Sequence, residues 1–123
     1  MEARKPMKYM LLIAGADDGW NHLDQAGQRE LYGHVSTWWN EKVAAGEILE
    51  GAQLQPASTA TTVRRAIDGE VSVTDGPFVE GKEVVGGYAV IEAPDLDAAI
   101  SFASSWPAPD VLEIRPLVVG DMG

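Results

Sequence analysis

The chain has 123 residues and a formal net charge of −10, from nine Lys and Arg against nineteen Asp and Glu. This length makes one domain, because domains commonly contain about 50 to 250 residues, and a hydrophobic fraction of 46% is that of an ordinary globular protein. The absence of cysteine excludes disulfides, thiolate metal sites and a cysteine nucleophile. The negative charge makes nucleic acid and anionic membranes poor partners, since phosphate binding requires local positive charge.

The sequence offers no candidate for a targeting or membrane-spanning segment. The apolar run 10–14 is too short for a secretory signal, and no stretch approaches the roughly 18 apolar residues of a membrane span. We therefore expect a cytoplasmic protein. We also expect a single domain over residues 1–123, with its folded core at about 7–118 between loose ends.

The first half of the chain predicts a strand, a helix and a second strand. Residues 7–14 have apolar side chains on both faces, which is typical of a strand in the middle of a sheet. A helical period follows over about 28–45, and Gly46 is suited to end the helix. Residues 48–54 form the next predicted strand. The apolar stripe of the helix lies at four-residue steps, with Trp38 flanking it: Leu31, Val35, Trp39 and Val43.

The second half predicts a hairpin, a strand, a helix and a last strand. Runs 59–65 and 70–74 flank Asp68-Gly69, a pair that favours a tight turn with both residues at positive φ. The strand over 84–92 contains Gly86-Gly87, which permits a bulge or a close backbone approach. Asp95 is a suitable N-cap for a helix that Pro107 ends, and residues 111–118 form the last strand. The expected buried stripe of this helix is Leu96, Ala99, Ile100 and Ala103.

This order of elements predicts an α+β, ferredoxin-like sandwich with an inserted β-hairpin. Two helical crossovers among strands favour an antiparallel sheet with both helices on one face. Tyr9, Leu11 and Ile13 then share one face of the first strand, and Met10 and Leu12 share the other. Because the helices cover only one face, we expect a homodimer that buries the second one and encloses a cavity.

Several segments resemble one known family. The run Val73–Glu83 (VTDGPFVEGKE), followed by Gly86-Gly87-Tyr88, is similar to the signature of the DGPF branch of the YCII-related proteins. The opening segment 7–13, segments 54–56 and 61–64, and the closing segment 112–116 are similar to the same family, so the resemblance covers roughly residues 7–118. It implies a ferredoxin-like fold in a dimeric α/β-barrel arrangement.

The resemblance gives two hints about activity. Some members resemble domains encoded beside, or fused to, extracytoplasmic-function sigma factors. One YCII-related branch removes chloride from chlorinated hydroquinones, a chemistry associated with a His on the first helix and an Asp before the Pro that ends the second. Here His34 lies one position out of register and Trp106 precedes Pro107, so the dyad is incomplete and that activity is not carried over.

The candidate catalytic residues are His34 and Asp75. A histidine at the rim of a pocket can act as a general base near pH 7. The alternative is a partly exposed helix residue beside an aromatic ring. His22 has no partner at a telling spacing, and two histidines 12 apart without cysteine do not predict a metal site.

The segment from Asp75 to Glu83 is the most distinctive candidate for ligand binding. Gly76 permits a turn and Pro77 fixes φ, so we expect a rigid loop anchored by Phe78. One interpretation is that the loop shapes the connection and fastens the dimer; the other is that its charged side chains rim a cavity. The candidate substrate-binding residues are Trp38, Arg64, Phe78, Glu80, Lys82, Glu83 and Tyr88.

Two further pairs leave alternatives open. Arg64 and Arg115 are single basic residues on strands, and either could clamp an anionic substrate or form a surface ion pair. Trp38 and Trp39 point about 100° apart on a helix, so one is expected in the core and the other at a partner, a pocket or solvent.

These observations favour a protein that binds a small molecule in a cavity between helices and sheet. The alternative is a general acid/base enzyme acting on a small, possibly aromatic substrate, with His34 as base and Asp75 or Glu83 assisting. A third hypothesis, a regulatory partner of a sigma factor, follows from the resemblance alone. No nucleotide, flavin or haem fingerprint occurs, so no cofactor is expected.

Overall fold

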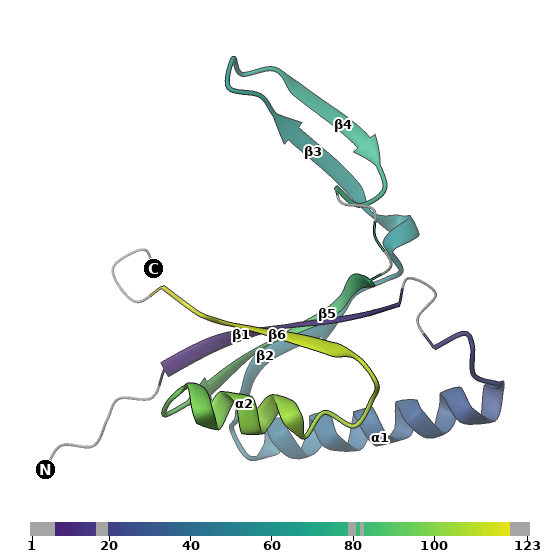
Figure 1. Cartoon of the computed structure of the whole chain (residues 1–123), viewed down its shortest axis with the longest axis vertical. Coiled ribbons are helices and arrows are strands. Elements are labelled where there is room, and N and C mark those ends of the chain that lie inside the picture. Colours follow the sequence, from purple (N-terminus) through teal and green to yellow (C-terminus); the bar gives the residue numbers. More distant parts are fainter. Residues whose placement is uncertain (1–6, 17–19, 79–80, 82, 119–123) are drawn as a thin grey trace, which may run out of the picture.

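The computed structural model describes residues 7–16, 20–78, 81 and 83–118. The chain forms an antiparallel sheet in the order β2-β5-β1-β6, with a separate two-stranded ribbon, β3-β4. Both helices lie on one side of the sheet (Figure 1). The α+β, ferredoxin-like prediction is therefore confirmed. The elements are β1 (Met7–Ala16), α1 (Gln25–Ala44), β2 (Ile48–Gln53), the 3₁₀ turn η1 (Ala57–Thr59), β3 (Thr61–Arg65), β4 (Val71–Asp75), β5 (Glu83–Ala93), α2 (Leu96–Ser104) and β6 (Val111–Pro116).

Side-chain caps determine where the helices begin. The Asp24 carboxylate accepts a 2.7 Å hydrogen bond from the backbone N–H of Gly27, so α1 begins at Gln25, a few residues before the predicted start. Asp95 accepts from the N–H of Ala98 at 2.9 Å, which confirms it as the N-cap of α2. Gly46 follows α1 with φ at +78°, the left-handed conformation expected after a helix C-terminus.

The hydrophobic core lies between the helices and one face of the sheet. Leu11 of β1 and Ile91 of β5 are fully buried at its centre, as are the small side chains Ala89 and Ala99. The predicted inward face of the first strand is confirmed, since Tyr9, Leu11 and Ile13 are all buried. Burial of such apolar surface is the main favourable term in folding.

The predicted apolar stripes of the two helices are only partly buried. On α1, Trp38, which flanks the stripe, is buried, whereas Trp39 is half-buried and Val43 at the end of the stripe is 47% exposed. On α2, Ala99 is buried as predicted, but Phe102 completes the packed face while Leu96 and Ile100 remain exposed. Apolar residues occur on more than one side of each helix, so four-residue spacing alone could not determine which side meets the sheet.

A bulge in β5 bends the sheet at one end. Ile13 pairs with Gly87 and Ala14 pairs with Val85, which leaves Gly86 without an opposite residue. A Cβ placed on Gly87 would lie 3.1 Å from the carbonyl oxygen of Ala52 on β2. Both the bulge and the close approach predicted for this glycine pair are confirmed.

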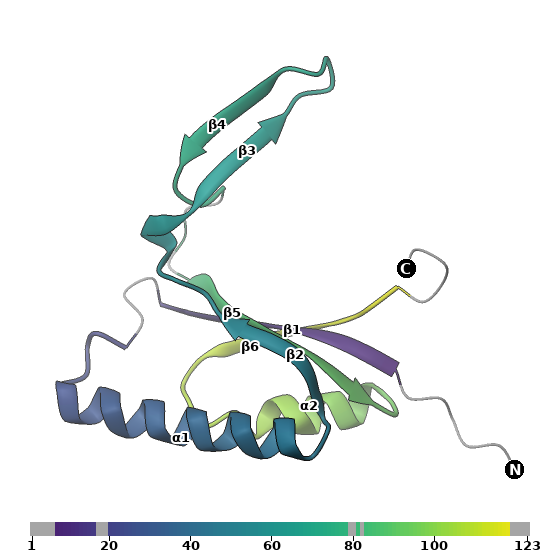
Figure 2. The same ribbon diagram turned by 180° about the vertical axis from the view of Figure 1, so that it is seen from behind.

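The β3-β4 hairpin projects away from the sheet and helices (Figures 1 and 2). The turn differs from its prediction: Gly69 has φ of +94°, but no described residue other than glycine has positive φ, so Asp68 does not. Its carboxylate instead accepts a hydrogen bond from the N–H of Glu70 at 2.9 Å. The loop closes through the N–H of Ala66, which donates to the carbonyl of Glu70. Asp68 thus stabilises the turn as an acceptor.

The opposite face of the sheet has no described element packed on it. Met10 and Leu12 of β1 lie on this open face, beside Val90 and Tyr88 of β5 respectively. Val90 is buried but does not belong to the core on the helix side. None of the described helices is long and apolar enough to cross a bilayer.

Candidate functional site

A cavity of about 700 Å³ lies between residues 28–40 of α1 and the bulged end of the sheet. The strand ends of β1, β2 and β5 form one wall, and the segment around Trp106 closes another side. This volume falls within the range of small-molecule sites, which is about 300–1,000 Å³. The Gly86 bulge lies on the wall, so the irregularity of β5 contributes directly to the shape of the cavity.

Aromatic side chains line the cavity from three segments, the turn before α1, α1 itself and the segment after α2: Trp20, Tyr32, Trp39 and Trp106. Trp39 rests on the backbone of β2, because a Cβ placed on Gly51 would lie 2.6 Å from the Cη2 atom of its indole. The missing side chain at Gly51 therefore creates the seat for this ring. Trp106 stands edge-on to Trp38 with ring centroids 5.1 Å apart, which ties the cavity wall to the core.

Asp110 is the one charged side chain among the described residues that line this cavity. Its Oδ2 atom accepts a 2.9 Å hydrogen bond from the indole N–H of Trp106. Its Oδ1 atom lies against Gly15 of β1, where a Cβ would come within 2.6 Å of it. Trp106 thus holds the carboxylate, and the missing side chain at Gly15 leaves room for it. The remaining polar lining is neutral and includes Asn21, Gln28, Ser36, Asn40, Gln53 and Gln55.

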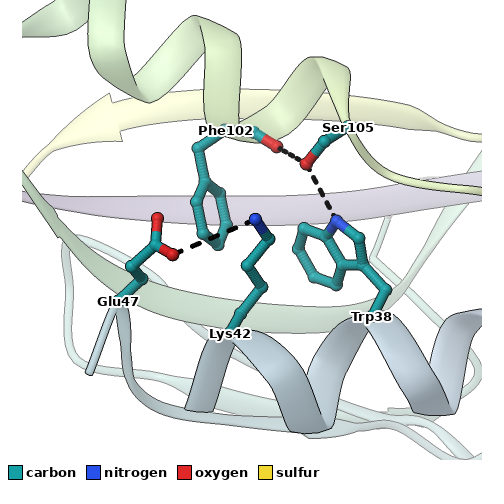
Figure 3. Close-up of polar contacts among 5 residues, drawn as sticks. All are labelled: Trp38, Lys42, Glu47, Phe102 and Ser105. Carbon is teal, nitrogen blue, oxygen red and sulfur yellow. Dashed lines mark hydrogen bonds and ion pairs between the residues drawn. The ribbon is translucent and has the colours of Figure 1, made fainter. Parts of the chain in front are cut away.

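The neighbouring part of the helix–sheet contact is filled with side chains (Figure 3). The indole N–H of Trp38 donates to the hydroxyl of Ser105 at 2.8 Å, and that hydroxyl donates to the carbonyl of Phe102 at 2.6 Å. Lys42 places its ammonium 5.4 Å from the Phe102 ring centroid and 3.9 Å from a carboxylate oxygen of Glu47. Trp38 is only 8% exposed and does not line the cavity, so it joins the two helices.

Neither predicted catalytic residue lines the larger cavity. The His34 side chain is 62% exposed on α1, with its Nε2 atom 3.8 Å from Glu30 one turn earlier. Asp75 is exposed at the end of β4 in the projecting hairpin. Among the described residues no group of three or more His, Asp or Glu is arranged to hold a metal ion.

A second hollow of about 510 Å³ lies at the base of the hairpin, next to the first. Phe78 and Glu83 line it, and residues 54–57 and 84–85 border both hollows. Phe78 is 70% exposed, so its ring does not anchor the loop as predicted. Arg64 instead holds this segment, because its guanidinium donates to the carbonyl oxygen of Phe78 at 3.1 Å.

The other candidates are dispersed. Tyr88 lies on the open face of the sheet, opposite Leu12 of β1 and Ala52 of β2. Arg115 pairs with Glu113 on the exposed surface of β6, in agreement with the ion-pair interpretation. The predictions for Glu80 and Lys82 lie outside the described residues.

The sequence prediction missed most of the residues that line the cavity. Trp20 and Asp110 lie in connecting segments, and the sequence distinguishes Trp106 only as the residue before Pro107. The one signal in the sequence for a cavity residue was the pair Trp38-Trp39. It predicted that one ring packs in the core and that the other lies at a partner, a pocket or solvent. This is confirmed, with Trp38 in the core and Trp39 on the cavity wall.

Comparison with known proteins places the whole fold in one family. The model of the YCII-related domain matches residues 7–119. An uncharacterized protein of Rhizobium meliloti (strain 1021) is 38% identical over 81 residues, which covers 63% of this chain. The matched region spans 64% of that relative's own length. The match of the family model over nearly all of the described residues shows that the chain belongs to the YCII-related domain family.

Proposed function

We propose that this protein binds a small aromatic molecule in the larger cavity, between α1 and the bulged end of the sheet. The observation that carries the proposal is the seat of Trp39 on Gly51, which holds a flat ring along the wall of a 700 Å³ cavity. Apolar walls with a few polar groups are typical of small-molecule sites. Neutral amides such as Gln28 and Gln53 supply hydrogen bonds that orient a ligand.

The test is a thermal-shift screen of small aromatic metabolites against the full chain, followed by calorimetric titration of each hit. Tyr32→Ala removes an exposed ring from the cavity with little effect on the core. Phe78→Ala is the matched control, because this exposed ring lines only the neighbouring hollow. We expect the tyrosine variant to weaken binding about tenfold and the phenylalanine variant to leave it unchanged. The reverse pattern would move the site to the hairpin base.

A general acid/base enzyme is the second candidate, and the position of Asp110 favours it. A carboxylate held by Trp106 on the cavity wall can accept a proton from a bound molecule and return that proton at a later step. His34 and Asp75 take no part in this version of the proposal. Once a substrate is found by binding, Asp110→Asn is expected to abolish turnover; unchanged turnover in that variant would exclude the assignment.

We further propose that the open face of the sheet pairs with the same face of a second copy, as the dimeric α/β-barrel prediction requires. Support comes from its pattern: Met10 and Leu12 lie centrally, while Glu50 and Arg115 lie on the edge strands. An apolar centre with a charged rim is typical of homodimer interfaces. Valines on the exposed hairpin, Val63 and Val73, offer additional surface to a partner.

Light scattering on the eluting protein tests the dimer. We expect the wild type to elute as a dimer and Leu12→Glu as a folded monomer, because a charge at the centre of an interface loses its hydration on assembly. Val43→Glu on the exposed side of α1 is the control and should remain dimeric. A monomeric wild type at about 50 μM would refute this arrangement. The sigma-factor partner and the cytoplasmic location remain predictions from the sequence.

A further inference from the structure

We infer that the larger cavity selects ligands that carry a protonated amine, so that the occupant is an organic cation with an aromatic ring. This inference rests on the proposed function and deepens it by naming the charge of the ligand. Three features of the described residues carry it: the fixed carboxylate of Asp110, the surrounding aromatic rings and the absence of a cationic side chain from the described lining.

The carboxylate of Asp110 accepts one hydrogen bond from the described residues and has capacity for more. Trp106 donates to Oδ2 at 2.9 Å, and no other described residue donates a hydrogen bond to this side chain. No Lys or Arg belongs to the described lining of the cavity, so the negative charge has no counter-ion on its walls. The residue is half-buried, which reduces its contact with water. A charged donor on the ligand would complete this site, since hydrogen bonds between ionised groups are the strong ones.

The rest of the lining favours a cation for independent reasons. The faces of Trp and Tyr rings attract a positive charge within about 6 Å, and Trp20, Tyr32 and Trp39 line the same space. The amide oxygens of Gln28 and Gln53 can accept further hydrogen bonds from an ammonium group. The net charge of −10 adds a field that concentrates cations and repels anions.

A comparison of amines with their neutral and anionic isosteres tests the preference for a cation. Calorimetry on the full chain would use 2-phenylethylamine, 2-phenylethanol and 3-phenylpropionate, and the indole series tryptamine, tryptophol and indole-3-propionate. We expect the better amine to bind about tenfold or more tighter than its alcohol, with the carboxylate weakest. Raising the salt concentration should weaken only the amine, because exposed charges are screened.

Asp110→Asn tests whether this carboxylate is the cause. The amide oxygen can still accept from Trp106, so the wall is preserved while the charge is lost. We expect the variant to lower amine affinity to that of the alcohol and to leave the alcohol unchanged. Asp97→Asn is the control, since it removes one exposed carboxylate on α2 outside the cavity and should have no effect.

The outcomes separate the two proposals. If the alcohols or carboxylates bind as tightly as the amines, the cavity is a ligand site but the inference about charge is wrong. If Asp110→Asn still binds the amines more tightly than the alcohols, the inference about charge is also wrong. If no compound of either series binds, the proposed function falls together with the inference.

Discussion

Trp38 and Trp39 are neighbours in the sequence, yet they divide the contact between helices and sheet into two different halves. Around Trp38, the Phe102 ring, the Ser105 hydroxyl and the Lys42 side chain pack together (Figure 3). The ring of Trp106 stands edge-on to Trp38 as well. Around Trp39, the same two layers enclose a cavity of about 700 Å³. The bulge at Gly86 and the bare backbone of Gly51 lie at the hollow half. The comparison shows that the irregular backbone of β5 and the bare backbone of β2 lie on the side of the candidate site and not around Trp38.

The largest expected loss of stability comes from a substitution in the packed half, around Trp38. Trp38→Ala should lower the free energy of unfolding by about 3–5 kcal/mol, as for other buried tryptophans, because it leaves a void between α1 and α2. Urea unfolding followed by circular dichroism measures this loss. Trp38→Phe keeps most of the ring but removes the hydrogen bond to Ser105 and should cost about 1–2 kcal/mol.

The same substitution at Trp39, beside the cavity, should reduce stability less than Trp38→Ala does and reduce ligand affinity more. Trp39→Ala is expected to cost about 1–2 kcal/mol, since part of its ring faces the cavity and not the core. Ligand affinity should fall at least as far as in Tyr32→Ala. Equal stability losses at the two tryptophans would contradict the division into packed and hollow halves.

A methyl group at Gly51 would test whether the seat of Trp39 is as tight as the distances indicate. Gly51→Ala places a Cβ 2.6 Å from both Trp39 Cη2 and the carbonyl oxygen of Tyr88. Because the carbonyl belongs to a paired strand, it cannot move freely, and we expect a loss of about 1–3 kcal/mol. Unchanged thermal unfolding in this variant would indicate a looser seat.

The N-cap of α1 is expected to contribute less to stability than these packed positions do. Asp24→Ala removes the acceptor for the Gly27 N–H at the end of the helix that borders the cavity and should cost about 1 kcal/mol. Hydrogen exchange should speed up in the first turn of α1 and remain unchanged around Trp38. Uniform acceleration along the helix would show instead that α1 opens as one unit.

The smallest expected effect is a gain in stability from a substitution at Gly33. A Cβ on Gly33 would meet no other atom within 4 Å, and the residue is exposed in the middle of α1. Gly33→Ala should therefore stabilise the protein by about 0.5–1 kcal/mol, because alanine loses less backbone entropy on forming a helix. It is also the control for Gly51→Ala, as the same substitution is predicted to have the opposite sign.

The sequence predicted the elements and their order well, because periodicity and turn residues are local signals. The hairpin, the bulge at Gly86-Gly87, the N-cap at Asp95 and the two-faced strand 7–14 are all found in the structure. The side of each helix that packs against the sheet was harder to predict, because Val43, Leu96 and Ile100 fit an apolar stripe but remain exposed.

The candidate site could not be predicted in the same way. Asp110 and Trp106 face a cavity whose other walls come from residues far away in the chain, such as Gly15 and Gly51. Nothing in their local sequence indicates that neighbourhood. The prominent DGPF segment drew attention to Phe78 and Glu83, which line the adjacent hollow.

The most direct test of the central claim locates the ligand by the backbone amide signals of the protein in solution. The tightest amine or aromatic binder is titrated into isotopically labelled full chain, and chemical-shift changes are followed by NMR. If the ligand binds in the larger cavity, large changes are expected at its glycine amides, Gly15, Gly51 and Gly86. Changes confined to Thr59, Ala60 and Phe78 would place the ligand in the hollow at the hairpin base and contradict this claim.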